Sequence, residues 1–288
     1  MPNGSFSDKD VYQKRLKFLI SLLFILVILG WSGQLLAQLF PVRVDRWLEV
    51  RELSGNVSYH HGQTTRPARP QDRLSAIGDT ITTGRNSAAN LVIDTGMGSV
   101  QVAEATTVRV QQLDTASDGG RITRLRVTGG QVRLQVRRLT NPSSTLEIET
   151  PAGISGVRGT VFGIGVQPDG KTGVATLEGQ VVAMAQGEQV PISGGLQSLV
   201  VPGSPPTPPT PLREDPRLDL RLLASINSRT ARIAGQIDPV NLLLIDQEPQ
   251  TVDLTGQFDL QVPFSNRRLV ATVITPLGSR REYQLSVP

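Results

Sequence analysis

The stretch that decides the fold runs from Thr150 to Ile164 and reads Thr150-Pro151-Ala152-Gly153-Ile154-Ser155-Gly156-Val157-Arg158-Gly159-Thr160-Val161-Phe162-Gly163-Ile164. It predicts two short strands around a glycine-rich bend, because Pro151 ends strand pairing and the glycines allow a positive φ or a close backbone approach. It contains no Cys, His, Asp or Glu that could act as a base or a metal ligand. We therefore interpret this signature segment as architecture, with Phe162 in the core.

The composition bounds the rest of the chain. With 288 residues it is long enough for two domains. Hydrophobic residues make up 38% and aromatic residues 4%, so the cores must consist mainly of Val, Leu and Ile. The absence of Cys excludes disulfides, cysteine-ligated zinc and thiol catalysis. The net charge of +4 is spread along the chain and predicts no nucleic-acid partner.

An uncharged apolar segment at residues 18–40 carries the localisation signal. Its length of about 23 residues suffices to cross a bilayer, which takes about 20. The basic residues before it, Lys14, Arg15 and Lys17, suit a cytoplasmic flank. We expect a single-pass signal anchor in a bacterial inner membrane, with a short cytoplasmic tail at 1–17. A cleaved signal peptide and a secreted product are the alternative, because the densest apolar run is only about 14 residues long. In both cases the chain after Pro41 lies outside the cytoplasm.

The body of the chain alternates in hydrophobicity with a period of two, which predicts an all-β fold. The clearest case is residues 132–137, where Val132, Leu134 and Val136 share one face and the intervening polar residues share the other. Such alternation is typical of a sheet with one buried and one solvated side.

Internal repetition indicates how the strands are arranged. Three triplets open a strand with Gly, an amide residue and Val: Gly55-Asn56-Val57, Gly130-Gln131-Val132 and Gly179-Gln180-Val181. The stretch 81–93 also parallels 148–164, since each has a strand ending in Thr, a turn, small residues and a second strand. Repeated short β units predict a roll or a solenoid-like stack.

Residues from about 47 to 202 resemble a FecR-type domain. The resemblance rests on motifs in the family's order: Gly55-Asn56-Val57, Gly78-Asp79-Thr80-Ile81-Thr82-Thr83-Gly84, Ser87-Ala88-Ala89-Asn90-Leu91, Gly130-Gln131-Val132, Thr150-Pro151, Val157-Arg158-Gly159-Thr160-Val161-Phe162 and Leu177-Glu178-Gly179-Gln180-Val181. It implies an all-β domain outside the cytoplasm at 41–201. The family's named member relays a signal from an outer-membrane transporter to a cytoplasmic sigma factor, through a cytoplasmic domain for which residues 1–17 are too short.

These observations predict a non-enzymatic, membrane-tethered envelope protein. Its FecR-like domain would bind or scaffold an envelope protein or a cell-wall polymer. The alternative is an envelope signal sensor that acts through a separate cytoplasmic partner. No cofactor and no metal are expected.

The candidate contact residues lie in the signature segment: Thr150, Pro151, Gly156, Arg158, Gly159, Thr160 and Phe162. Arg158 either ties down turn carbonyls or a carboxylate, or contacts an anion or a partner. Six arginines between Gly120 and Thr140 (Arg121, Arg124, Arg126, Arg133, Arg137 and Arg138) either form a solvated sheet face or meet lipid headgroups and anionic polymers. The pair His60-His61 is interpreted as solvated turn residues.

A proline-rich linker at 202–216 precedes a second β domain at 217–288. The linker should be extended and semi-rigid. The C-terminal strands suit a small sandwich. The stretches 233–239, 256–258 and 277–278 resemble a bacterial immunoglobulin-like domain, which implies a spacer or a protein contact. Neither tryptophan falls within it.

Overall fold

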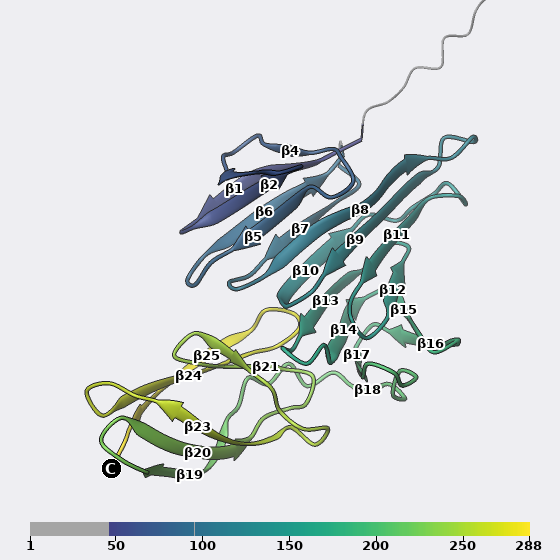
Figure 1. Ribbon diagram of the computed structural model, residues 1–288. Coiled ribbons are helices and arrows are strands. Elements are labelled where there is room, and N and C mark those ends of the chain that lie inside the picture. Colours follow the sequence, from purple (N-terminus) through teal and green to yellow (C-terminus); the bar gives the residue numbers. More distant parts are fainter. Residues whose placement is uncertain (1–45, 95) are drawn as a thin grey trace, which may run out of the picture. The chain divides into compact units, whose positions relative to one another are not determined.

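The computed structural model describes residues 46–94 and 96–288 (Figure 1). The predicted apolar segment 18–40 and the tail 1–17 lie outside the described residues. Within the described part, no helix is long and apolar enough to span a membrane. Residues 45–288 group into one compact unit.

Two nine-stranded sheets make up the larger region. Its strands are β1 (Leu48–Ser54), β2 (Val57–His61), β3 (Thr64–Pro67), β4 (Arg73–Leu74), β5 (Thr80–Thr83), β6 (Ala88–Ile93), β7 (Gly98–Val102), β8 (Thr107–Thr115), β9 (Arg121–Val127), β10 (Gly130–Val136), β11 (Thr145–Glu149), β12 (Ile154–Val157), β13 (Val161–Val166), β14 (Thr172–Glu178), β15 (Gln180–Ala185), β16 (Glu188–Ser193), β17 (Leu196–Val200) and β18 (Thr210–Pro211). The first sheet has the order β18-β17-β14-β13-β10-β7-β6-β1-β4, and the second β16-β15-β12-β11-β9-β8-β5-β2-β3. The all-β prediction is confirmed.

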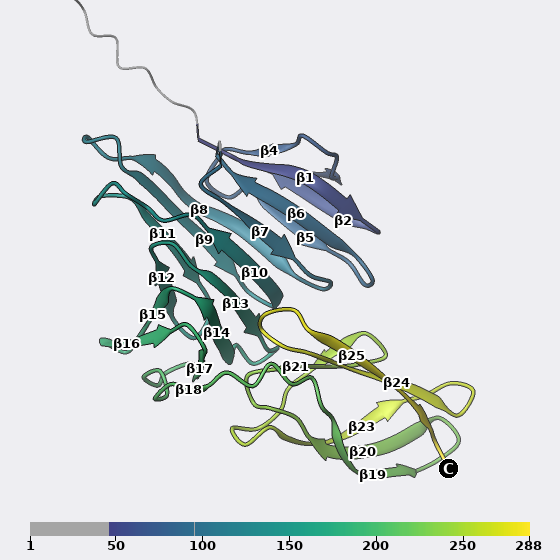
Figure 2. The ribbon, with the colours of Figure 1, turned by 180° about the vertical axis from the view of Figure 1, so that it is seen from behind.

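The chain builds these sheets by crossing between them, usually after each hairpin (Figures 1 and 2). The hairpins β6–β7 and β13–β14 lie in the first sheet, and β8–β9 and β15–β16 lie in the second. Among the strand pairs of the described residues, only β9 and β11 run parallel. This winding confirms the predicted roll.

The core lies between the sheets and consists mainly of aliphatic side chains. Val132, Leu134 and Val136 are buried as their alternation predicts. Phe162 is fully buried among them and has the largest of the fully buried side chains in residues 46–94 and 96–288. Complete burial of such a side chain contributes roughly 1.5–3 kcal/mol to folding.

The outer edges of both sheets are closed to further strand pairing. β4 and β18 are two residues long, and β3, β16 and β18 contain Pro67, Pro191 and Pro211 respectively. A short strand or a proline without an N–H removes the template that a free edge offers. These features disfavour the addition of a further strand at either edge.

The C-terminal region is a smaller sandwich. Its strands are β19 (Asp219–Ser225), β20 (Thr230–Gln236), β21 (Leu242–Ile245), β22 (Glu248–Gln250), β23 (Gln257–Pro263), β24 (Arg268–Ile274) and β25 (Arg280–Ser286). One sheet has the order β19-β20-β23 and the other β22-β21-β24-β25. A separate hydrophobic cluster that includes Ile233, Leu243, Phe258 and Leu269 fills it. The predicted small sandwich is confirmed.

Two glycines on β13 and β14 give this sandwich its seat on the roll. A β-carbon at Gly163 would overlap the backbone of Pro276 and lie 2.8 Å from the Leu277 nitrogen. A β-carbon at Gly173 would lie 2.9 Å from the Val240 Cα. We call Gly163 and Gly173 the glycine face. It brings the backbones of the two regions into direct contact.

Gln167 supplies polar contacts beside the glycine face. Its Nε2 donates to the carbonyls of Pro239, at 3.0 Å, and Asn241, at 3.2 Å. Its Oε1 accepts from the Val252 amide at 3.3 Å. One side chain of the roll therefore holds three backbone groups of the sandwich.

The proline-rich segment between the two regions begins with a turn at 202–204 and is hydrogen-bonded to the roll. The Thr207 amide donates to the Leu199 carbonyl at 2.9 Å, and the Leu212 amide donates to the Gly195 carbonyl at 2.8 Å. The Asp215 carbonyl accepts from the Asn241 side chain at 2.9 Å. The domain boundaries at 201 and 217 stay predictions.

Candidate functional site

The first half of the signature segment is a tight hairpin turn within the second sheet. The Thr150 amide donates to the Gly153 carbonyl at 2.8 Å, and the Thr150 hydroxyl donates to the same carbonyl at 3.1 Å. Pro151 is exposed at the turn, which joins β11 to β12. The proposed parallel with residues 81–93 is wrong here, because Thr83 ends a strand that leads into the first sheet.

The second half is a corner at which the chain crosses from β12 to β13. Gly159 has a φ of 109°, and a β-carbon there would lie 2.6 Å from the Arg138 Cα. Both expected reasons for glycine therefore apply at this position. Gly156 differs, because the atom nearest to its β-carbon would be the flexible Met184 Cε at 3.5 Å. Gly156 therefore has neither a positive φ nor a close backbone neighbour, and the prediction of one of these at Gly156 is wrong.

The three Gly-amide-Val triplets mark equivalent corners. Gly55, Gly130 and Gly179 have φ values of 72°, 84° and 79°. Each lies where the chain passes from one large sheet to the other, between β1 and β2, β9 and β10, or β14 and β15. The repeat seen in the sequence is therefore a repeated turn geometry.

A residue of positive φ followed by a hydroxyl residue packs against each of these glycines. The pairs are Asn86-Ser87 against Gly55, Ala105-Thr106 against Gly130 and Gly159-Thr160 against Gly179. In the first corner Ser87 Oγ accepts from the Asn56 amide at 2.8 Å. In the second corner Thr106 Oγ1 accepts from the Gln131 amide at 3.0 Å.

The third corner, in the signature segment, lacks this bond. Thr160 is buried and directs its methyl carbon toward Gly179, 2.8 Å from where a β-carbon would lie. Its hydroxyl oxygen is buried without a hydrogen-bond partner among the described residues. Thr160 therefore closes its corner by packing alone, and an unpaired buried hydroxyl costs stability.

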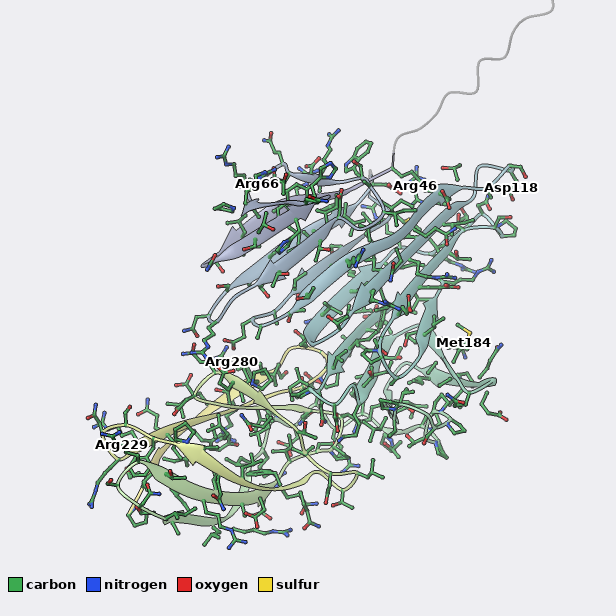
Figure 3. All side chains as sticks on the ribbon, in the orientation of Figure 1. Arg46, Arg66, Asp118, Met184, Arg229 and Arg280 are labelled. Atoms are coloured by element: carbon green, nitrogen blue, oxygen red, sulfur yellow. The ribbon has the colours of Figure 1, made fainter. Side chains whose placement is uncertain are left out.

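Of the two roles considered for Arg158, the structure shows the contact with a turn carbonyl. It is exposed, and its guanidinium donates to the Pro142 carbonyl. It also borders a groove of about 370 Å³ that Gly156, Val182 and Met184 help to line. Figure 3 labels Met184 on this outer surface. A partner contact at Arg158 stays a prediction.

The seven candidate residues do not converge on one site. Gly156, Arg158 and Gly159 line the groove just described. Thr150 and Pro151 line a separate hollow around the hairpin turn. Thr160 and Phe162 are buried. The signature segment is therefore mainly a corner brace with one exposed arginine.

The six arginines do not form one basic surface. Arg124 pairs with Glu147 at 2.6 Å, and Arg126 pairs with Glu149 on the neighbouring strand. Arg133 lies on β10 in the other sheet. The prediction of one continuous basic stripe that could meet polyanions is therefore wrong, because the arginines are divided between the two sheets and some are paired with carboxylates.

The histidine pair lies on β2 and not in a turn. His61 Nδ1 lies 2.7 Å from Asp79 Oδ1, and Tyr59 Oη donates to Asp79 Oδ2 at 3.3 Å. Burial, followed by the neighbouring Asp79 carboxylate, raises the pKa of Tyr59 to about 12. Across residues 46–94 and 96–288, no group of three His, Cys, Asp or Glu side chains could hold a metal ion.

Comparison with known proteins finds one family model that matches part of the chain. Residues 79–182, from the end of the β4–β5 connection into β15, match the family model described as FecR protein. Two crystal structures of a protein described as an anti-sigma factor, from Parabacteroides distasonis ATCC 8503, are 16% identical with a TM-score of 0.39. The match covers 46% of this chain and 59% of that one, so this chain spans less than two thirds of its length. No curated protein matches. The residues that match the FecR family model, 79–182, therefore include the signature corner.

Proposed function

We propose that this protein is a regulatory component of the bacterial cell envelope. Its FecR domain receives a signal outside the cytoplasm, and a separate cytoplasmic partner carries the signal onward. The observation that carries this proposal is the family match at 79–182, which spans the crossovers at Ala105, Gly130, Gly159 and Gly179. The family is regulatory rather than catalytic.

The roles of the signature residues support regulation over catalysis. Gly159 holds a corner, Phe162 fills the core and Arg158 ties down a carbonyl. None of these contacts presents a reactive group to solvent. The signature segment therefore serves as a structural support for binding surfaces elsewhere on the domain.

Arg46, labelled in Figure 3, anchors the point at which the chain enters the roll, which suits transmission from the N-terminal side. Arg46 is buried and pairs with Asp94 at 2.7 Å. It also donates to Thr123 Oγ1 at 2.6 Å and to the carbonyls of Asp114, at 2.6 Å, and Ile122, at 2.5 Å. A displacement of the roll would pass through this anchor into the preceding segment.

A scaffold is the second candidate function. It is favoured by the seating of the C-terminal sandwich on the glycine face, which makes one large surface from two β regions. The two candidates differ in what they need from residues 1–13. Only a signal relay requires that tail to engage a cytoplasmic partner.

Transcript profiling after deletion and complementation tests the proposal. Loss of the protein should change a small, coherent set of transcripts, and the full chain should restore them. A chain without residues 1–13 that is made at the same level should not restore them. Restoration by both versions would favour the scaffold, and an unchanged transcript set would contradict the regulatory role.

A further inference from the structure

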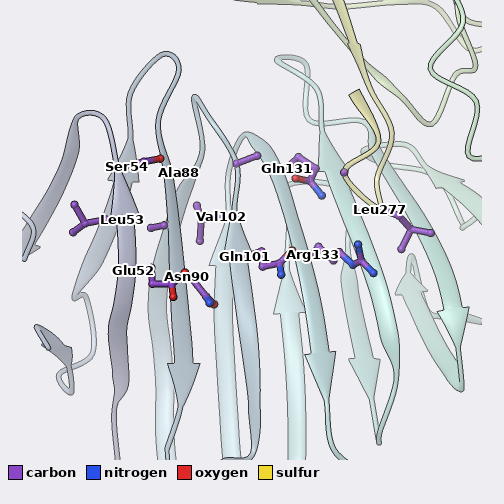
Figure 4. Close-up of a pocket in the computed structure, with 13 residues that line it drawn as sticks. Glu52, Leu53, Ser54, Ala88, Asn90, Gln101, Val102, Gln131, Arg133 and Leu277 are labelled. Atoms are coloured by element: carbon purple, nitrogen blue, oxygen red, sulfur yellow. The ribbon is translucent and has the colours of Figure 1, made fainter. Parts of the chain in front are cut away.

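Four polar side chains form a row across the outer face of the first sheet (Figure 4). Strand pairing places Glu52 of β1 opposite Asn90 of β6, Asn90 opposite Gln101 of β7, and Gln101 opposite Arg133 of β10. Their strand neighbours Leu91, Val100 and Val132 are buried in the core, so the polar row faces outward. The row begins at a carboxylate and ends at a guanidinium.

The polar row makes no polar contact of its own. Within residues 46–94 and 96–288, none of the four side chains has a hydrogen-bond or ion-pair partner. The Asn90 side-chain oxygen is buried and unpaired. Elsewhere on the sheets, oppositely charged neighbours pair, as Arg124 does with Glu147. Buried polar atoms normally have partners, so an unpaired one needs an explanation.

The row lies in a groove with a volume of about 470 Å³. Small side chains beside it, Ser54, Ala88 and Ala103, leave its flank open. The loop with Leu277 and Gly278 of the C-terminal sandwich forms a wall at the Arg133 end (Figure 4). Gln131 holds that loop by donating to the Pro276 carbonyl at 2.7 Å. The Arg133 end of the groove is therefore closed by the sandwich.

We propose that this groove binds an extended peptide segment that crosses strands β1 to β10. A basic group of the peptide pairs with Glu52, its main-chain amides bond to Asn90 and Gln101, and a carboxylate pairs with Arg133. Neighbouring strands lie about 4.8 Å apart, so three steps separate the charged ends by roughly 14 Å. An extended chain rises about 3.3 Å per residue, so the two charged residues of the ligand are four positions apart.

The chemistry of the groove favours a peptide over a neutral sugar chain. Its lining, as described, contains no aromatic ring on which a sugar could stack. A neutral ligand would also leave Glu52 and Arg133 uncompensated beneath it. A peptide offers alternating donors and acceptors to the two carboxamides, each of which can donate and accept. It can also carry opposite charges at the required spacing.

The test measures binding of synthetic peptides to the full chain in detergent. The probe is Lys-Ala-Ala-Ala-Glu with acetylated and amidated ends, and the comparison peptide is Glu-Ala-Ala-Ala-Glu. The unchanged protein should prefer the first, and Arg133→Ala should lower that affinity about tenfold, as expected for loss of a charge-assisted bond. Glu52→Lys should reverse the preference, because both ends of the row are then cationic.

Matched variants separate this result from general effects. Arg51→Ala changes a neighbouring exposed charge that does not line the groove and should bind as the unchanged protein does. If Glu52→Lys does not fold, Arg133→Glu provides the mirror test, with preference for Lys-Ala-Ala-Ala-Lys.

Equal binding of the first two peptides, no binding at millimolar concentration, or tighter binding of chitotetraose would overturn the proposal. The transcript experiment on the regulatory role is independent of these outcomes, so either proposal can fail alone.

Discussion

The carbonyl oxygen of Gly159 faces Gly179 so closely that a β-carbon at position 179 would lie 2.5 Å from it. Gly159 lies where the chain enters the first sheet, and Gly179 lies where it leaves it. The two crossings therefore brace one another at one end of the roll. A β-carbon at Gly179 would therefore displace the Gly159 backbone, whereas a β-carbon at Gly159 would meet the Arg138 backbone.

Gly159→Val should lower the free energy of unfolding by more than about 1 kcal/mol, because valine disfavours a φ of 109° and would meet the Arg138 backbone. Gly156→Val is the matched control. It lies on a strand beside a flexible Met184 and should change stability by less than about 0.5 kcal/mol. Thermal melting of both variants measures these changes. Equal losses of stability would contradict the requirement for glycine at the Gly159 corner.

Thr106→Val and Thr160→Val should differ although the residues occupy equivalent corners. The Thr106 hydroxyl accepts from the Gln131 amide, so its loss leaves a buried donor unpaired and should cost about 1–3 kcal/mol. The Thr160 hydroxyl has no described partner, so its removal should be neutral or stabilising. Denaturant unfolding measures both values. A larger loss at Thr160 would show that its hydroxyl is bonded in solution.

Gly163→Ala should loosen the C-terminal sandwich, because the new methyl group would meet the Pro276 backbone. The hydrogen-bonded segment 212–215 should then become open to limited proteolysis, whereas in the unchanged protein its hydrogen bonds should slow cleavage. Gly165→Ala is the control, since the atoms nearest to its methyl group would be those of the Leu242 side chain at 3.4 Å and the Val240 carbonyl oxygen at 3.6 Å, both at ordinary contact distance. Equal cleavage in both variants would mean that the glycine face does not seat the sandwich.

Arg46→Met should destabilise the roll by roughly 3–5 kcal/mol, because it leaves the buried Asp94 carboxylate without its main partner. Arg51→Ala, at an exposed position nearby, serves as the control. A loss below about 1 kcal/mol would indicate that water or Arg121, 3.8 Å from Asp94, replaces Arg46.

Stability should also respond to alkaline pH through Tyr59. Its pKa is raised from 10.0 to about 12 in the folded state by burial and by Asp79. The protonated phenol therefore stabilises the fold fully below pH 10.0, and this contribution is lost as the pH rises toward about 12. The difference in melting temperature between the unchanged protein and Tyr59→Phe should shrink over this range. A constant difference would contradict the assignment.

Local patterns in the sequence were sufficient to predict the strands and the class of fold. The alternation at 132–136 marked the buried face of β10, and the Gly-amide-Val triplets marked corners. These local patterns could not predict which of the two sheets each strand enters. Thr83 ends β5 and Thr150 directly follows β11, yet the first precedes a crossing and the second a hairpin turn, because distant strand pairing decides between them.

Local sequence patterns could not predict the groove, for the same reason. Glu52 and Arg133 are aligned through three strand pairings, and the first of these depends on a bulge between Val50 and Glu52. A shift by one residue would turn Asn90 into the core and Leu91 outward. The seat of the sandwich likewise depends on Gly163 meeting Pro276, which lies more than a hundred positions later.

The glycine face has a consequence for biosynthesis. The ribosome completes β13 and β14 well before it makes Val240, Pro276 and Leu277. The nascent roll must therefore hold a strip of uncovered peptide groups in water until the last part of the chain emerges. Packing of the sandwich against the roll then follows synthesis of the roll, and it adds the wall that Leu277 and Gly278 form at one end of the groove. A chain that ended before Leu277 would lack this wall.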